Sequence, residues 1–247
     1  MKTHLEKLNH ILTRYIELPD DDSKQVKVLH DLRVSARKLI TLINPNETLT
    51  ASLKKLIQSS NKIRDLDVFI NETLPIFPKK LQADLKEVHL TLHNTRADMN
   101  HEFKSLLSDE LIGDLNQTHT PSTKQEIKAD LSRHQMPLND IDKRLKKVVR
   151  ELQLLDLEDK QLHKIRLVTK RLHYQLERFY PEEKKSIALA KLIQTQLGKF
   201  HDIYQAIKLV KHNKPLLKPK TYKSCIDFLK DKKMQSIREL RKDIRKK

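Results

Sequence analysis

The 247-residue sequence is short of the residues on which most other fold classes depend. It contains two glycines, Gly113 and Gly198, no tryptophan and only 4% aromatic residues. Strands favour aromatic side chains and helix interiors exclude glycine, so this poverty, beside abundant Leu, Lys, Glu and Gln, favours helices over sheets. We therefore predict an all-α fold.

Cysteine and long apolar runs are also scarce. The single cysteine, Cys225, excludes an internal disulfide and is typical of a reducing compartment. Residues 1–6 do not resemble the start of a signal peptide, and no uncharged apolar run reaches the roughly 18 residues of a membrane span. These absences predict a soluble, cytoplasmic protein with no membrane partner.

The motifs of several enzyme classes are missing. The chain has no Gly-rich phosphate loop and no Ser/His/Asp or Cys/His pattern. The pairs His30-Asp31 and His201-Asp202 resemble ligands of helical HD-type phosphohydrolases. In the two repeats described below, however, Asp31 corresponds to Lys164 and His201 corresponds to Arg64, so the ligand types do not recur. We predict no catalytic residue, no metal and no cofactor, and keep an HD-type metal-dependent phosphohydrolase as the less favoured alternative.

Positive charge is what the sequence has in excess. Fifty Lys and Arg against 33 Asp and Glu give a formal net charge of +17 and a pI near 9.8. Such an imbalance normally indicates a polyanionic partner. Single-strand nucleic-acid readers offer aromatic platforms for base stacking, which are few here, and no zinc finger or RNP motif occurs. Nonspecific binding of a nucleic-acid backbone remains an alternative.

A basic helical motif occurs twice in the chain. Val28–Leu39 reads VLHDLRVSARKL and Gln161–Leu172 reads QLHKIRLVTKRL, so each copy has a histidine followed by cations three, seven and eight residues later. At about 100° per residue, the histidine and the cations three and seven residues later share roughly 60° of one helix face. The residues are His30, Arg33, Arg37 and Lys38 in the first copy, and His163, Arg166, Lys170 and Arg171 in the second.

A fainter repeat follows each motif. Lys62–Leu66 aligns with Lys199–Ile203, so that Arg64-Asp65 corresponds to His201-Asp202. The first stretch continues to a second acid, Asp67, whereas the later stretch has Tyr204 at that position. Each half therefore pairs one cation-faced helix with one basic-acidic helix.

These residues resemble the conserved histidine α-helical domain (CHAD) family, whose members carry the H-x-x-R-x-x-x-[RK]-[RK] helix twice, each followed by an [RH]-D-x-D-like stretch. The resemblance covers essentially the whole chain and implies one CHAD domain over residues 1–247, which binds inorganic polyphosphate without catalysis and associates with polyphosphate granules. Family members often have a further basic residue ten positions after the histidine, where this chain has Ile40 and His173.

On this resemblance we predict that the binding residues surround a basic groove or pore shared by the two halves. They are His30, Arg33, Arg37, Lys38, Arg64, His163, Arg166, Lys170, Arg171, His173, Lys199 and His201, with Asp65 and Asp202 orienting the neighbouring cations.

Apolar spacing predicts eight principal helices, near residues 5–16, 23–43, 50–70, 79–107, 141–152, 161–179, 182–212 and 221–247. They are expected to form two pseudo-symmetric four-helix bundles, residues 1–108 and 137–247, joined by a connector over 109–136. The mixed charges of the fourth helix, Arg96 among them, are expected to form a mostly solvated surface. The basic tract of the last helix is expected to extend the positive surface, and the sequence predicts no oligomeric state.

Overall fold

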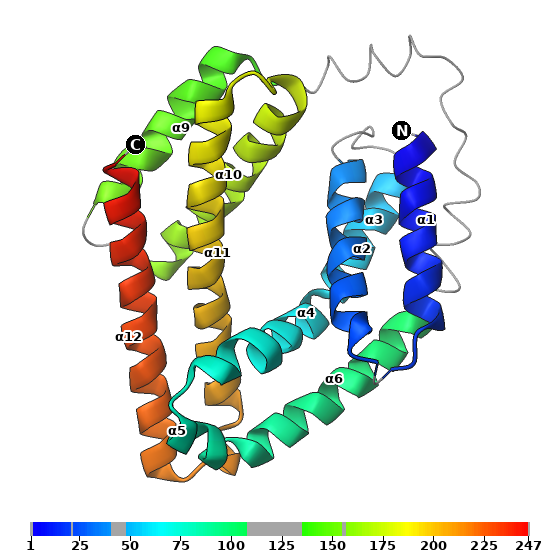
Figure 1. Cartoon of the computed structure of the whole chain (residues 1–247), viewed down its shortest axis with the longest axis vertical. Coiled ribbons are helices and arrows are strands. Elements are labelled where there is room, and N and C mark those ends of the chain that lie inside the picture. The colour runs from blue at the N-terminus through cyan, green and yellow to red at the C-terminus, as the bar shows by residue number, and fades with distance from the viewer. Residues whose placement is uncertain (1, 21, 41–47, 108–134, 155–156, 247) are drawn as a thin grey trace. The chain divides into compact units, whose positions relative to one another are not determined.

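The computed structural model describes residues 2–20, 22–40, 48–107, 135–154 and 157–246 (Figure 1). Every regular element in these ranges is a helix, which confirms the all-α fold. Among the described helices, none has the length and apolar character that a bilayer crossing requires.

The chain folds into two compact units. Among its described elements, the first unit contains α1 (Lys2–Glu17), α2 (Lys24–Ile40), α3 (Thr48–Ser59), α4 (Asn61–Val68), the π-helical turn η1 (Phe69–Thr73), the 3₁₀ turn η2 (Leu74–Ile76) and α6 (Lys86–Leu106). The second contains α5 (Lys79–Asp84), α9 (Leu138–Gln153), α10 (Asp159–Phe179), α11 (Lys184–His212), the 3₁₀ turn η4 (Lys214–Leu216) and α12 (Pro219–Ile244).

The division between the units differs from the predicted halves in one segment. Residues 77–84, placed in the first half from the sequence, belong to the second unit. The buried ring of Phe77 packs against Phe228 of α12 at a centroid separation of 5.0 Å, and Thr221 Oγ1 donates to Asp84 Oδ2 over 3.1 Å. Residues 108–134, and with them most of the predicted connector, lie outside the described part of the chain.

Each unit buries the apolar stripes of its helices in a core of its own. In the first unit Leu8 and Leu12 of α1 meet Leu29 and Leu32 of α2, and equivalent leucine and isoleucine stripes of α9, α10 and α11 meet in the second. An amphipathic helix that buries one stripe presents its opposite face to solvent. The histidines that open the two motifs, His30 and His163, are accordingly exposed.

In each unit, the last described helix places a cation at the C-terminal end of another helix. Lys104 of α6 donates to Leu18 O, just beyond α1, and Arg241 of α12 donates through Nε to Leu152 O near the end of α9 over 2.9 Å. The C-terminal carbonyls of a helix lack partners within the helix and carry partial negative charge, so cations stabilise them. The arrangement of the chain as an internal repeat stays a prediction from the sequence.

Candidate functional site

The first motif helix, α2, places His30 and Lys38 on the side opposite the core. Leu29, Leu32 and Leu39 of the same helix are buried, while His30 and Lys38 are exposed. The pKa of His30 is lowered first by partial burial of the ring and then by the positive charges of Arg64 and Arg37, which outweigh the acids nearby. The structure therefore brings the predicted residues His30, Arg37 and Arg64 together in the first unit.

Arg33 lies deeper than the other motif residues and is a correction to the predicted site. Its side chain is 5% exposed. Nη1 donates to Ile57 O over 2.7 Å and to Ser60 Oγ, and Nη2 donates to Asn61 Oδ1 over 2.8 Å. Burial, followed by the charge of Arg37, lowers the pKa of Arg33 to about 10, so the group remains a cation at neutral pH. Arg33 is thus bound to the α3–α4 junction and is closed to a polymer in solvent.

The companion helix α4 has its cation paired with an acid. Arg64 Nη2 lies 3.0 Å from Glu72 Oε1, a carboxylate that is largely exposed to solvent. An exposed pair of this kind stabilises a protein by about 1 kcal/mol or less, so a multivalent anion can compete for the guanidinium. The second acid of the stretch, Asp67, is buried and paired with Arg96 at 2.8 Å. The sequence predicted that Arg96 lies on a solvated surface. This prediction is wrong, because Arg96 is buried beside Asp67.

The second unit brings together a denser basic cluster. Here α10 carries exposed His163 and half-buried Arg166 and Lys170, and the ring of His201 on α11 lies against the ring of His163 at a centroid separation of 5.3 Å. The pKa of His201 is lowered to about 4, mainly because the ring is buried. The positive charges of Arg166, His163, Lys208 and Lys170 lower it in the same direction. We call these five residues the second-unit cluster.

Arg166 and Lys208 are two cations of this cluster for which the described ranges provide no acid partner. Within the described part of the chain, neither makes a hydrogen bond or an ion pair. Lys208 Nζ instead lies 4.4 Å from the centroid of the Tyr204 ring, where the π-face attracts a cation. Both cations therefore keep their charge available for an anion.

The sequence did not identify Lys208 or the role of Tyr204. Lys208 lies seven residues, or two helical turns, after His201 and so shares its face of α11, a spacing that could have identified it. Tyr204 occupies the position of Asp67 in the fainter repeat. Lys233 Nζ lies 5.9 Å from the Tyr204 centroid and binds Asp159 at 2.6 Å.

His173 is a second correction to the predicted site. Its ring is buried in the second unit, 3.5 Å from Glu177 Oε1, and burial lowers its pKa. A buried ring cannot contact a polymer in solvent. Arg171 and Lys199 are exposed, and no contact within the described ranges joins them to the second-unit cluster. Their role, like that of Asp65 and Asp202 as orienting acids, stays a prediction.

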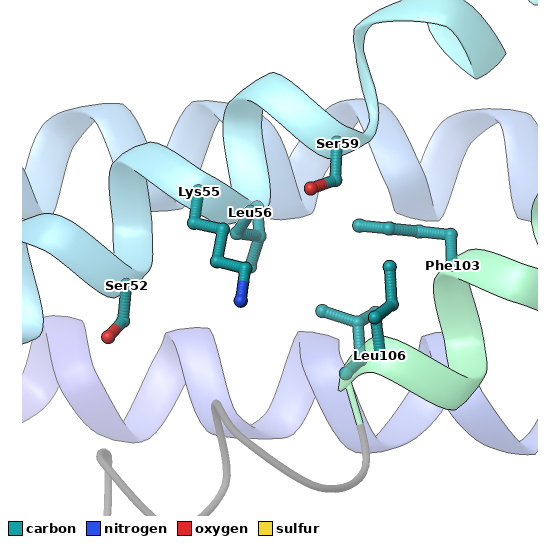
Figure 2. A pocket seen from close by; sticks show the side chains of 7 residues that line it. Ser52, Lys55, Leu56, Ser59, Phe103 and Leu106 are labelled. Atoms are coloured by element: carbon teal, nitrogen blue, oxygen red, sulfur yellow. The ribbon is translucent and has the colours of Figure 1, made fainter.

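Among the hollows in the surface of the described residues, two lie apart from the motif residues. Arg238, Arg241, Lys242, Arg245 and Lys246 line a shallow one at the end of α12, within the predicted basic tract. Figure 2 shows the other, between α3 and α6, where Leu56, Phe103 and Leu106 form apolar walls and Lys55 is the one charged side chain of its lining. The latter lacks the charge that a polyanion site requires.

Acidic and histidine side chains do not assemble into a metal site in the described residues. No group of three or more His, Cys, Asp or Glu side chains is placed there to hold a metal ion.

Comparison with known proteins places the chain in one family. The CHAD domain family matches residues 4–211. The crystal structure of the CHAD domain from the plant Ricinus communis is 18% identical in sequence and superposes with a TM-score of 0.61, covering 98% of this chain and 88% of that chain. At this identity the likeness shows the fold alone. No curated protein matches the sequence.

Proposed function

Because the chain belongs to the CHAD domain family, we propose that it binds inorganic polyphosphate through its basic motif faces and catalyses no reaction. The observation that carries this proposal is the second-unit cluster, where Arg166 and Lys208 have no acid partner among the described residues. Guanidinium and ammonium groups are natural donors to phosphate oxygens, and several of them on adjacent helices favour a multivalent anion.

The aromatic residues near the cluster favour a polymer without bases. Lys208 covers the ring of Tyr204 at 4.4 Å, and Lys170 Nζ lies 5.9 Å from the centroid of Tyr174. A ring with a cation over its face is not an open platform on which a nucleic-acid base can stack. Inorganic polyphosphate presents phosphate alone and needs no such platform. The groove or pore shared by the halves, and targeting to polyphosphate granules, stay predictions from the family resemblance.

A competition assay at fixed salt tests the proposal against its alternatives. Fluorescent long-chain polyphosphate is bound to the protein and displaced by unlabelled polyphosphate or by duplex DNA of equal total charge, with and without Mg²⁺ or Mn²⁺. We expect polyphosphate to displace the label at concentrations about tenfold or more below those of DNA, with no phosphate released. Equal displacement by DNA would indicate a nonspecific backbone binder, and metal-dependent phosphate release would indicate a hydrolase.

A matched pair of variants separates the cluster from the general charge of the protein. Neutralising Arg166, Lys170 and Lys208 to glutamine removes three charges from the cluster. Neutralising Lys218, Lys220 and Lys223, which are exposed near the start of α12, removes the same number elsewhere in the same unit. Binding should be lost in the first variant and nearly kept in the second.

A further inference from the structure

Glu72 pairs with a predicted binding residue of the first unit, Arg64. Arg64 Nη2 donates a hydrogen bond to Glu72 Oε1 over 3.0 Å. The side chain of Glu72 is 57% exposed and that of Arg64 is 22% exposed, so solvent reaches both groups. A carboxylate offers a guanidinium the same kind of charged oxygen that a phosphate offers. In the free protein Glu72 therefore occupies the donor that a phosphate would use.

A π-helical turn sets the relation between these two side chains. In a continuous α-helix, residues eight apart lie about 12 Å apart along the axis and about 80° apart around it. Glu72 instead lies in the π-helical turn η1, which follows α4 directly and changes this relation. Asn71 Nδ2 supports the turn by donating to Asp67 O over 2.9 Å. Such turns are rare and frequently occur at functional sites.

The charge of Glu72 also reaches the first motif helix. The pKa of His30 on α2 is lowered first by burial and then by the charges of Arg64 and Arg37, while Asp31 and Glu72 act in the opposite direction. A carboxylate affects a ring in this way only when the two groups lie close together. Glu72 therefore reduces the positive potential that an anion meets at the motif residues of the first unit.

The sequence offers no matching carboxylate on the companion helix of the second unit. That helix, α11, carries one acid, Asp202, and no Asp or Glu occurs between Asp202 and Asp227. The residue aligned with Arg64 is His201, whose pKa is lowered by burial and then by nearby cations. An acid placed to oppose anion binding is therefore a feature that distinguishes the first unit from the second.

We propose that Glu72 is an intramolecular competitor for phosphate, whose carboxylate holds Arg64 in the free protein and must leave before polyphosphate binds the first unit. In this exchange Arg64 gives up a carboxylate oxygen and donates to phosphate oxygens instead. Because the pair is exposed, it lowers the affinity of the first unit by about twofold to fivefold and does not prevent binding. This inference rests on the proposed function and adds a residue that opposes it.

The test measures binding at the first unit from the nuclear magnetic resonance signal of His30 as tripolyphosphate is added, with folding followed by circular dichroism. Glu72→Gln keeps the size of the side chain and removes its charge. Half of the full shift should then be reached at a tripolyphosphate concentration about threefold to fivefold lower than in the wild type, because the competitor and its repulsion are lost together.

Glu17→Gln is the matched control, since it removes the same charge from an exposed position of the same unit. The charges that shift the pKa of His30 come from other residues. This variant should change the concentration at half shift by less than about twofold.

A double variant distinguishes competition from general repulsion. Arg64→Gln removes the group for which Glu72 and phosphate compete, so adding Glu72→Gln in that background should improve binding by less than about twofold. An equal improvement in both backgrounds, or none in Glu72→Gln alone, would overturn the inference.

Two results with the wild-type protein separate this inference from the proposed function. Binding of tripolyphosphate with the His30 signal unmoved would overturn the role of Glu72, while polyphosphate binding would stand on the second unit. Failure to bind either tripolyphosphate or long-chain polyphosphate would overturn the proposed function together with this inference.

Discussion

Replacing Arg96 by leucine should lower the free energy of unfolding of the first unit by about 3–5 kcal/mol, as expected when one partner of a buried ion pair is removed. Arg96 is 7% exposed and Asp67 is 1% exposed. Arg96 Nε binds Asp67 Oδ1 at 2.8 Å, and Nη1 also donates to Gln25 Oε1 over 3.0 Å. Without the guanidinium, the Asp67 carboxylate remains buried and loses its paired charge, and only the more distant charges of Arg64 and Arg33 still favour its ionised form. Urea unfolding near pH 7, followed by circular dichroism, measures the loss.

Two further variants sharpen this prediction. Lys233 of α12 also pairs with an acid, Asp159, but this pair is partly exposed, so Lys233→Leu should cost about 1 kcal/mol or less. Replacing both Arg96 and Asp67 by leucine should recover most of the loss, because neither charge of the pair is then left buried without its partner. A loss in Arg96→Leu no greater than that in Lys233→Leu would contradict the account of the buried pair.

Low pH should partly rescue the Arg96→Leu variant. Burial already raises the pKa of Asp67 in the wild-type protein, while Arg96 lowers it. Removing Arg96 raises that pKa further. A carboxyl group whose folded-state pKa is raised destabilises the fold above that pKa, and the destabilisation disappears as protonation neutralises it. Unfolding curves at successively lower pH should therefore show the gap between variant and wild type closing.

The affinity for polyphosphate should rise about fourfold to tenfold from about pH 8 to about pH 6. In the free protein the pKa of His201 is lowered to about 4 by burial and by the charges of Arg166, His163, Lys208 and Lys170. A bound polyanion neutralises those charges and favours protonated His201, so its pKa in the complex should return to about 6.5–7. Binding is then accompanied by proton uptake, which isothermal titration in buffers of different ionisation enthalpy measures directly.

The same pKa shift predicts the opposite trend for the free protein. Because the folded state holds His201 unprotonated below its ordinary pKa of 6.5, the unfolded chain binds more protons between 6.5 and about 4, and stability is lost as the pH falls through this range. Added polyphosphate should remove that loss. His201→Gln is the control, and should flatten both the affinity and the stability profiles. An affinity that does not change across the range would exclude His201 from binding.

Much of the fold could be predicted because helix spacing is a local property of the sequence. The apolar stripe at Leu5, Leu8, Leu12 and Ile16 predicts a helix at the position of α1, and Pro137 marks the start of α9. The predicted third helix, residues 50–70, is instead broken at Ser60 into α3 and α4, and its last turn is π-helical. The local pattern of residues 50–70 does not indicate this break. The side chain that binds the junction, Arg33, comes from another helix, α2, and lies outside that pattern.

The candidate site was predicted less completely, because periodicity indicates which residues share a face but not how deep each lies. His163 and His201 were expected to be together and are in ring contact. Arg33 and His173 were expected at the surface but are buried, since the helices packed over them determine burial. Arg96 was expected in solvent because its buried partner, Asp67, comes from a distant part of the chain.

Nuclear magnetic resonance of the histidine side chains tests the central claim most directly. Tripolyphosphate is titrated into protein labelled at histidine, and the His163 and His201 signals are assigned with His163→Gln and His201→Gln. We predict that both signals shift with one common binding constant and that the pKa of His201 rises from about 4 toward its ordinary 6.5 in the complex. Saturation of binding with both signals unmoved, and the changes confined to other histidines, would contradict the account.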